Sequence, residues 1–281
     1  MSEARTVAVI TGGAGGMGLA TAKIMGTNHR LLLSDVSDDR LDAAVAELRA
    51  AGVDADATRC DVTDGDSVRA LVERARSLGE VVAVVHTAGV SPQMGGPEMM
   101  LRINALGTVA VTAAFLAGAA PGFRIVNVAS MSAYMSPRAA MPRGTYKYAL
   151  TDPERFVSKV MRRLRITGEE QRSGFAYAIS KNFVVWHAKK MASEFGARGA
   201  RIVSVSPGSI DTPMGRLEQD HGAGQMLRFA ALKRFGRVEE IAEVLAFCAS
   251  NKAGYLTGTD ILCDGGVVAG VRLKDLLSVG R

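Results

Sequence analysis

Two residues suited to acid–base chemistry, Tyr177 and Lys181, lie four positions apart in an apolar run that is compatible with a helix. Residues at this spacing share one face of a helix, so the phenol and the ammonium group point into the same space. A free tyrosine has a pKa of about 10, and a nearby cation lowers it by favouring the phenolate. The pair could therefore move a proton to or from an alcohol or carbonyl oxygen. Such pairs also arise by chance, so this interpretation depends on the rest of the chain.

A glycine-rich turn follows the first apolar run of the chain. Residues 7–10 are typical of a strand buried on both faces, and residues 19–25 predict a helix. A turn between a strand and a helix brings bare backbone against a pyrophosphate at the helix N-terminus, which predicts a dinucleotide site. The turn fits two glycine templates, one through Gly13, Gly15 and Gly18 and the other through Thr11, Gly12, Gly16 and Gly18.

An acidic residue, Asp35, ends the next apolar strand and lies 17 residues after Gly18. This is close to the position at which a carboxylate binds the adenosine ribose hydroxyls of a dinucleotide. A carboxylate there repels a 2′-phosphate, and neither Gly13 nor Ala14 supplies a cation for one. The pattern favours NAD over NADP. The alternative is that Asp35 only begins a turn.

Apolar runs alternate with amphipathic helical patterns along the whole chain. This alternation predicts a single-domain, Rossmann-like α/β fold over residues 1–281, with a doubly wound parallel sheet of seven strands and helices on both faces. The ligand crevice of such a sheet lies at the carboxyl ends of its strands, where Asp35, Asp61 and Gly89 fall. After the first two strands, further strands are expected at residues 54–60, 81–85, 123–128, 201–206 and 259–263, and helices at 38–50, 66–78, 104–117, 174–195 and 236–249.

Composition limits the classes of protein to which the chain can belong. Hydrophobic residues make up 48% of its 281 residues and charged residues 22%, which is typical of a globular protein with a sizeable core. No apolar run long enough to span a membrane and no signal-peptide pattern are expected, and three scattered cysteines indicate neither a disulfide framework nor a metal site. A reducing cytoplasm is the expected location.

Most of the net charge of +6 falls in residues 136–173, which we call the basic segment. It holds nine Lys and Arg residues against four Asp and Glu residues. The charge is either a solvated helix face or a surface that attracts an anionic substrate or an acidic partner. No nucleic-acid motif accompanies it, so no nucleic acid is expected as a partner.

The basic segment also contains a helix pattern of its own. Asp152 is suited to cap a helix and Pro153 to begin it, and apolar residues from Phe156 to Leu164 follow at helical spacing, with Gly168 at its expected end. This predicts an ordered helix whose apolar face packs on the substrate, on the rest of the domain or on a second subunit.

Together these motifs resemble the short-chain dehydrogenase/reductase family. The resemblance covers residues 7–266. It departs from the family pattern at His86 and Thr87, in a shortened run from Gly89 to Asn104, in the 47 positions between Ser130 and Tyr177, and in a tail at residues 267–281. His86 is expected to be a packed or cofactor-adjacent residue rather than a catalyst, and the Thr87 hydroxyl is expected to keep supporting the sheet. The short run before Asn104 and the basic segment further resemble the bacterial 3α-hydroxysteroid dehydrogenase/carbonyl reductase branch.

The resemblance implies a role for each matching residue. Tyr177 would exchange the proton with the substrate oxygen, Lys181 would hold the nicotinamide ribose, Ser130 would orient the substrate oxygen, and Asn104 would hold a water molecule. No metal is implied. The residues implied to bind the cofactor are Gly12, Gly16, Met17, Gly18, Asp35, Asp61, Val62, Ala88, Gly89, Tyr177, Lys181, Pro207, Gly208, Ile210 and Thr212.

The resulting prediction is an NAD-dependent enzyme that interconverts a secondary alcohol and a ketone. The apolar side chains of a methionine-containing flap at residues 211–235 either contact the substrate or only pack in the fold. The first alternative, together with the basic segment, favours a bulky apolar substrate such as a hydroxysteroid. The alternatives are a carbonyl reductase, a 3-hydroxyacyl thioester dehydrogenase whose anionic carrier meets the basic segment, and a non-catalytic cofactor-sensing protein. Relatives in this family imply a homodimer or homotetramer.

Overall fold

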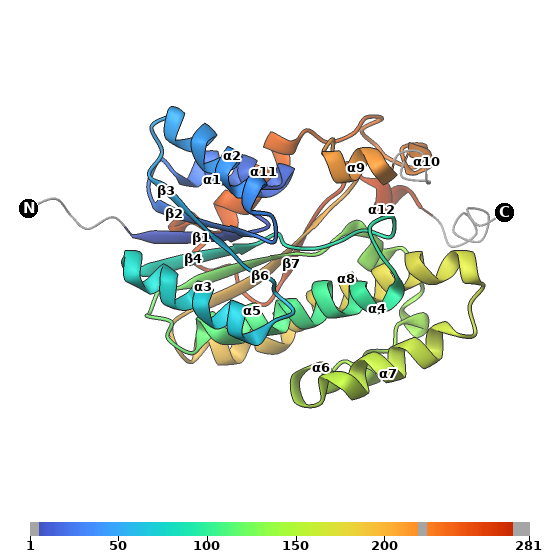
Figure 1. Ribbon diagram of the computed structural model, residues 1–281. Helices are drawn as coiled ribbons and strands as arrows, with labels where there is room; N and C mark the ends of the chain where they lie inside the picture. Colours follow the sequence, from blue (N-terminus) through green and yellow to red (C-terminus); the bar gives the residue numbers. More distant parts are fainter. Residues whose placement is uncertain (1–5, 219–223, 272–281) are drawn as a thin grey trace, which may run out of the picture.

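A computed structural model describes residues 6–218 and 224–271. Seven parallel strands form one sheet in the order β3-β2-β1-β4-β5-β6-β7, which confirms the doubly wound, Rossmann-like fold (Figure 1). The chain moves outward from β1 in one direction and returns to β4 beside it, so the ends of these two strands form the topological switch point. The strands are β1 (Val7–Thr11), β2 (Arg30–Asp35), β3 (Ala55–Arg59), β4 (Val81–His86), β5 (Arg124–Val128), β6 (Arg201–Pro207) and β7 (Asp260–Cys263).

Helices cover both faces of the sheet. One face is covered by α1, α2 and α11, and the opposite face by α3, α5 and α8 (Figure 1). The larger helices are α1 (Gly16–Met25), α2 (Asp38–Ala50), α3 (Gly65–Leu78), α5 (Gly107–Leu116), α7 (Pro153–Leu164), α8 (Glu169–Gly196) and α11 (Val238–Cys248). The shorter ones are α4 (Pro97–Met100), α6 (Tyr148–Thr151), α9 (Pro213–Glu218), α10 (Gly224–Met226) and α12 (Val267–Gly270).

Local sequence explains several of these boundaries. Strand β1 is buried at every position, as its unbroken apolar run predicts for a central parallel strand. The side chains of Ser37 and Asp64 cap α2 and α3 by accepting backbone N–H groups of their first turns. Helix α1 begins at Gly16 rather than at residue 19, because the last glycines of the turn already adopt helical geometry.

The helix that carries Asn104 is longer and less regular than the sequence indicates. It starts at Pro97 and runs through α4, a π-helical turn η1 (Leu101–Leu106) and α5. The expected start of this helix at residue 104 is therefore wrong, since a proline at its first turn begins it at Pro97. The whole of Pro97–Leu116 is apolar enough to span a membrane by length and composition, yet 56% of its most apolar window is buried inside the fold, as in an ordinary core helix.

The basic segment is folded onto the main body of the domain. Phe156, Val157, Val160 and Leu164 of α7 are buried against residues of α8 and of the Asn104 helix. The rings of Phe156 and Phe183 lie 5.5 Å apart, and Tyr146 contacts both. The sequence left three possible packing partners for the apolar face of this helix. In the structure, this face packs on the rest of the domain.

Two helix boundaries near the basic segment differ from the sequence interpretation. Helix α7 ends at Leu164, and Gly168 precedes α8 instead of closing α7. Helix α8 then starts at Glu169 and passes through Gly174, the expected start. A helix of this length tolerates one glycine because the cost of about 1 kcal/mol is small beside its tertiary packing.

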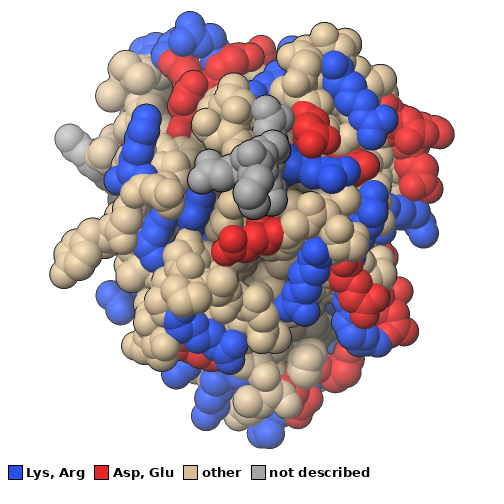
Figure 2. All heavy atoms as spheres, turned by 90° about the vertical axis from the view of Figure 1, so that its left-hand side faces the viewer, with Lys and Arg blue, Asp and Glu red and all other residues tan. Residues whose placement is uncertain are grey.

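Surface charge is mixed where the strands begin. In the view from the left-hand side of Figure 1, basic and acidic side chains lie interspersed over the face (Figure 2). Of the C-terminal tail, residues 267–270 form the short helix α12, and residues 272–281 lie outside the described part of the chain. The flap is described except for residues 219–223.

Candidate active site

The glycine turn joins β1 to α1 at the switch point of the sheet. Gly12 has a φ of +65°, a conformation that favours glycine, and a β-carbon there would lie 2.8 Å from the backbone nitrogen of Ala88. The turn can therefore approach the end of β4 only because this position is glycine. It closes through a hydrogen bond from the Gly15 N–H to the Gly12 carbonyl at 3.0 Å.

The first turn of α1 offers backbone donors to an anion. Gly16, Met17 and Gly18 are its first three residues, the first turn holds no acidic residue, and no side chain in the described part of the chain caps it. Such N–H groups bind phosphate through hydrogen bonds and the helix dipole. The residues present therefore fit the pyrophosphate of a dinucleotide.

The flap approaches this turn from the other side of the crevice. A β-carbon on Gly16 would lie 3.0 Å from a methyl carbon of Thr212, so the two segments are in close contact. Thr212 is buried, and its hydroxyl accepts the Gly215 N–H at 3.0 Å at the start of α9. Ile210 pairs with Gly236 in an isolated bridge, and Gly208 donates to the Cys263 carbonyl after the last residue of β6, Pro207. These contacts place the predicted nicotinamide-side residues along one edge of the crevice.

Asp35 ends β2 and lies beside a cation that sequence reasoning missed. One of its carboxylate oxygens accepts the Val36 N–H at 2.8 Å and a guanidinium N–H of Arg40 at 2.6 Å. The Asp35 side chain is only 8% exposed, whereas that of Arg40 is 56% exposed. The only sequence signal for this ion pair is that Arg40 follows Asp35 by five residues, in the first turn of a helix capped by Ser37. Arg40 lies where it can either hold Asp35 or meet an added anionic group.

The two residues expected near the adenine lie after β3. Asp61 is exposed, and one of its carboxylate oxygens accepts both the N–H and the hydroxyl of Thr63. Val62 is buried against Gly107, where a β-carbon would lie 2.7 Å from a Val62 methyl group. The Val62 side chain therefore packs this loop against the first residue of α5, Gly107.

Thr87 links the end of β4 to the glycine turn, as the sequence predicted. Its hydroxyl donates to the Thr11 carbonyl at 2.7 Å. His86 is buried, and its Nδ1 lies 2.6 Å from the Thr11 hydroxyl. Burial, the Lys181 charge and His187 lower the pKa of His86 to about 3, so the imidazole is neutral at physiological pH. His86 is thus a packed residue, as expected.

Asn104 and Lys181 meet behind Gly89. A β-carbon on Gly89 would lie 3.0 Å from the side-chain oxygen of Asn104 and 3.3 Å from Lys181 Nζ. The Asn104 amide accepts the Val90 N–H and donates to the Val90 carbonyl and the Ser180 hydroxyl. These contacts fix Asn104 within the π-helical turn, a feature that is frequent at functional sites.

The Tyr177–Lys181 pair lies on α8 with the geometry that its spacing predicts. Lys181 Nζ lies 5.7 Å from the centre of the Tyr177 ring and donates to the Val128 carbonyl at 3.0 Å. Lys181 is 5% exposed, whereas Tyr177 is partly exposed. A buried cation therefore lies under a phenol that solvent or substrate can reach.

Ser130 follows β5 and stands at the entrance of a short 3₁₀ helix, η2 (Met131–Tyr134). Its hydroxyl accepts the Ser132 N–H at 3.2 Å, and its side chain is partly exposed. Lys181 is bonded to Val128, two residues before Ser130, so β5 brings the serine and the lysine to one end of the sheet. The site thus combines a partly exposed serine and tyrosine with a buried lysine and asparagine.

Comparison with known proteins agrees with this geometry. The family model for short chain dehydrogenases matches residues 6–162, and a model described as enoyl-(acyl carrier protein) reductase matches residues 161–268. A short-chain dehydrogenase/reductase of Alternaria brassicicola is 34% identical over 96% of this chain and 97% of its own length. The cis-4-hydroxycyclohexanecarboxylate dehydrogenase of Sinomonas cyclohexanicum is 31% identical over 95% of this chain and 98% of its own.

A solved structure shows the same fold. The short-chain dehydrogenase/reductase from Serratia marcescens superposes with a TM-score of 0.75 at 27% identity, covering 94% of this chain and 98% of that one. The family match extends over more than half of the sequence, and the crevice holds the matching glycine turn, serine, tyrosine and lysine. This chain belongs to the short-chain dehydrogenase/reductase family.

Proposed function

We propose that the protein is an NAD-dependent oxidoreductase that interconverts a secondary alcohol and a ketone. The observation that carries the proposal is the buried Lys181 beneath the accessible Tyr177, at the same end of the sheet as Ser130 and the glycine turn. A bound dinucleotide supplies the hydride acceptor or donor for this chemistry. The residues of the chain bind it, orient the substrate and move the proton.

In the direction of oxidation, the Tyr177 oxygen takes the proton from the substrate hydroxyl. The Ser130 hydroxyl holds the same oxygen and limits its orientation. The Lys181 ammonium favours the phenolate by its charge. Asn104, fixed by Val90 and Ser180, supports the wall next to Lys181. In the direction of reduction, the same tyrosine returns the proton to the carbonyl oxygen.

The preference for NAD rests on Asp35 at the end of β2. Backbone N–H groups hold this carboxylate at the end of the strand, where it would repel a 2′-phosphate. Arg40 moderates this repulsion, because its guanidinium shares the same carboxylate oxygen. The ion pair makes the Asp35 carboxylate the residue to change in a test of cofactor choice.

A cyclic or otherwise bulky apolar alcohol, such as a hydroxysteroid, is the proposed substrate. The flap presents partly buried Met214, Met226 and Phe229, and its Leu217 is 57% exposed. The Sinomonas relative is named for a ring alcohol, cis-4-hydroxycyclohexanecarboxylate, which supports a cyclic secondary alcohol.

The test is a panel of cyclic, steroid and linear secondary alcohols and ketones assayed with NAD(H) and NADP(H) at the nicotinamide absorbance. We expect turnover of ring substrates with NAD(H) favoured. Absence of turnover over the whole panel, with tight dinucleotide binding retained, would instead identify a cofactor-sensing protein.

A 3-hydroxyacyl thioester dehydrogenase is the second candidate. It is favoured by the excess of cations in the basic segment and by the family model named for an acyl carrier protein reductase. This function predicts a KM for acyl-CoA substrates that rises with ionic strength, since charge attraction is screened by salt. The KM for an uncharged steroid would stay constant in the same titration.

A further inference from the structure

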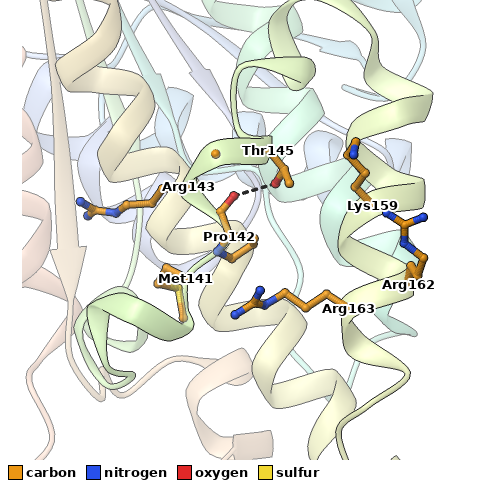
Figure 3. A pocket seen from close by; sticks show the side chains of 8 residues that line it. Met141, Pro142, Arg143, Thr145, Lys159, Arg162 and Arg163 are labelled. Carbon is orange, nitrogen blue, oxygen red and sulfur yellow. Dashed lines mark hydrogen bonds between the residues drawn. The ribbon is translucent and has the colours of Figure 1, made fainter.

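A pocket in the basic segment shares no lining residue with the candidate active site. It lies between α7 and the turn η4 (Arg143–Thr145), where the Thr145 hydroxyl donates to the Pro142 carbonyl at 2.7 Å (Figure 3). Its volume of about 560 Å³ lies within the range of about 300–1,000 Å³ that is usual for small-molecule sites. The pocket is therefore too large for a single inorganic ion and suits a small organic molecule.

The charges that line this pocket have one sign. Four of its eight lining residues are cations, Arg143, Lys159, Arg162 and Arg163, and none is acidic. Arg162 and Arg163 lie three and four residues after Lys159, and like charges at these spacings destabilise a helix. The acidic residue in the first turn of α7, Glu154, is bonded to Arg102 and lies outside the lining.

Helix stability explains only part of this arrangement. Arg162 and Arg163 lie in the last turn of α7, where cations interact well with the helix dipole. Lys159 precedes that turn, and Arg143 lies on the opposite wall, so the dipole accounts for neither. A ligand that brings negative charge accounts for the grouping of Lys159, Arg162 and Arg163 on one helix.

The walls of the pocket are held in place before any ligand binds. Helix α7 is anchored by its buried apolar face, and the turn is followed by the fully buried Tyr146, whose hydroxyl donates to the Asn182 side chain at 3.1 Å. Arg163 reaches from α7 towards Pro142 and donates to the Ala140 carbonyl at 3.2 Å, whereas Arg143 extends away from α7 (Figure 3). The guanidinium of Arg163 thus crosses the pocket and keeps further donors for an anion.

The turn is also connected to the candidate active site. Asn182, which accepts from Tyr146, follows Lys181 on α8 and donates its amide to the Ala133 carbonyl in η2 at 2.8 Å. Ala133 lies three residues after Ser130. A ligand that fixes the turn therefore contacts a chain of hydrogen bonds that runs to the segment of the catalytic serine.

We propose that this pocket binds the phosphate group of a small phosphorylated organic molecule. Lys159, Arg162 and Arg163 supply the donors, because guanidinium groups pair with phosphate through two parallel hydrogen bonds. Met141 and Pro142 supply apolar contact for the organic part. The proposal is independent of which alcohol the enzyme oxidises.

The test measures binding of phenyl phosphate by calorimetry, with saturating NAD(H) or NADP(H) present to fill the dinucleotide site. Phenol at the same concentration serves as the probe without phosphate, and ionic strength is matched with chloride. We expect phenyl phosphate to bind and phenol not to bind. The Arg162→Gln/Arg163→Gln variant should weaken phenyl phosphate at least tenfold, which corresponds to about 1.4 kcal/mol.

A matched variant separates a built site from general charge attraction. Arg155→Gln/Arg165→Gln removes two exposed cations of the same helix region that do not line the pocket, so its affinity should stay within about twofold of the native value. Equal weakening in both double variants, or no binding by the native protein, would overturn the proposal. The single change Lys159→Gln repeats the test if the first double variant fails to fold.

The unfolding temperature, measured with and without phenyl phosphate, gives a second readout. Arg162→Gln/Arg163→Gln removes two cations from the last turn of α7 and the bond from Arg163 to Ala140, so its unfolding temperature should be slightly below the native value, and it should lose the rise that phenyl phosphate gives the native protein. A lower unfolding temperature together with an unchanged rise would show that the cations serve stability alone.

The source of the phosphate is then distinguished by kinetics. If it belongs to the substrate, a phosphate-bearing alcohol should have a lower KM than its phosphate-free analogue, and Arg162→Gln/Arg163→Gln should abolish the difference. If it belongs to a separate ligand, the two alcohols should have equal KM values while calorimetry still detects phenyl phosphate. If calorimetry detects no binding of phenyl phosphate, the phosphate-site proposal is contradicted while turnover in the alcohol panel is unaffected. The proposed function and the phosphate-site proposal can therefore be contradicted independently of each other.

Discussion

The glycine turn and the basic segment present donor groups in opposite ways. The turn offers backbone N–H groups at the start of α1, and glycine is required there because main chain must approach main chain, as between Gly12 and Ala88. The basic segment offers long cationic side chains on a helix whose other face is buried. The first arrangement is fixed by local backbone geometry, and the second by tertiary packing.

This difference shows where the protein can vary without losing its chemistry. The backbone donors depend on few side chains, whereas the cations of α7 depend on the apolar contacts of Phe156 and its neighbours. Changes at the crevice should therefore alter catalysis with little loss of stability. Changes beneath α7 should alter stability first.

Removal of the Lys181 ammonium is expected to give the largest effect on the crevice. We predict that Lys181→Ala lowers kcat/KM by about 10²–10⁴-fold, because the acid–base group loses its cation. Steady-state kinetics with the best substrate of the panel measures the loss. Lys189→Ala, at an exposed lysine of the same helix, is the control and should stay near native activity. Comparable losses of activity in both variants would show that activity depends on the total positive charge of α8 and not on Lys181 in particular.

Removal of a buried ring beneath α7 tests the other region. Phe156→Ala should lower the free energy of unfolding by about 3–5 kcal/mol, because the cavity left between Tyr146 and Phe183 fills incompletely. Denaturant titration gives the value. Ile166→Ala, at a side chain that is 85% exposed in the same segment, should change stability by less than about 0.5 kcal/mol. A Phe156→Ala cost below about 1 kcal/mol would contradict the packing described for the basic segment.

Acid should weaken the fold through two buried histidines, His86 and His187. The pKa of His86 is lowered to about 3 and that of His187 to about 4, mainly by burial. The unfolded chain binds these protons below pH of about 6.5 and the folded chain does not, so stability is complete above that pH and falls as the pH is lowered. Each histidine contributes a slope of about 1.4 kcal/mol per pH unit between pH 6.5 and 4.

The change His86→Asn should remove one of these two slopes. Unfolding measured from pH 7.5 to pH 4 gives the comparison with the native chain. If the pH dependence of the variant equals that of the native chain, His86 is protonated in the folded protein. That result would contradict the description of His86 as a neutral, packed imidazole beside the glycine turn.

The smallest expected effect concerns cofactor choice at the end of β2. Asp35→Ala removes the carboxylate and leaves Arg40 available to a 2′-phosphate, so the ratio of kcat/KM for NADP to that for NAD should rise about tenfold, or about 1.4 kcal/mol. The double change Asp35→Ala/Arg40→Ala should lose most of that gain. A native enzyme that already prefers NADPH would contradict the assignment of Asp35.

Strand-end residues and the Tyr177–Lys181 pair could be predicted from the sequence because their positions follow from local patterns. A buried apolar run predicts where a strand ends, and helical spacing places a lysine beneath a tyrosine. The family resemblance rests on the same residues and is confirmed by the comparisons. Asp35, Thr87 and Lys181 accordingly lie where the patterns indicated.

Features that depend on distant contacts could not be predicted in the same way. The π-helical turn around Asn104 has no residue signature, because it is stabilised by contacts with Val90 and Ser180 from other segments. Gly168 carries the same turn signal whether it ends α7 or begins α8, and tertiary packing selects the second. The amphipathic pattern of α7 is compatible with three packing partners, and only the contact of Phe156 with Phe183 distinguishes among them.

The central claim is that Tyr177 exchanges the proton in nicotinamide-linked alcohol oxidation. The most direct measurement compares native protein with Tyr177→Phe, which removes one oxygen atom, by both dinucleotide binding and kcat. We predict that dinucleotide binding stays within about threefold while kcat falls by about 10²–10⁴-fold. Full turnover by Tyr177→Phe on the same alcohols would contradict the account.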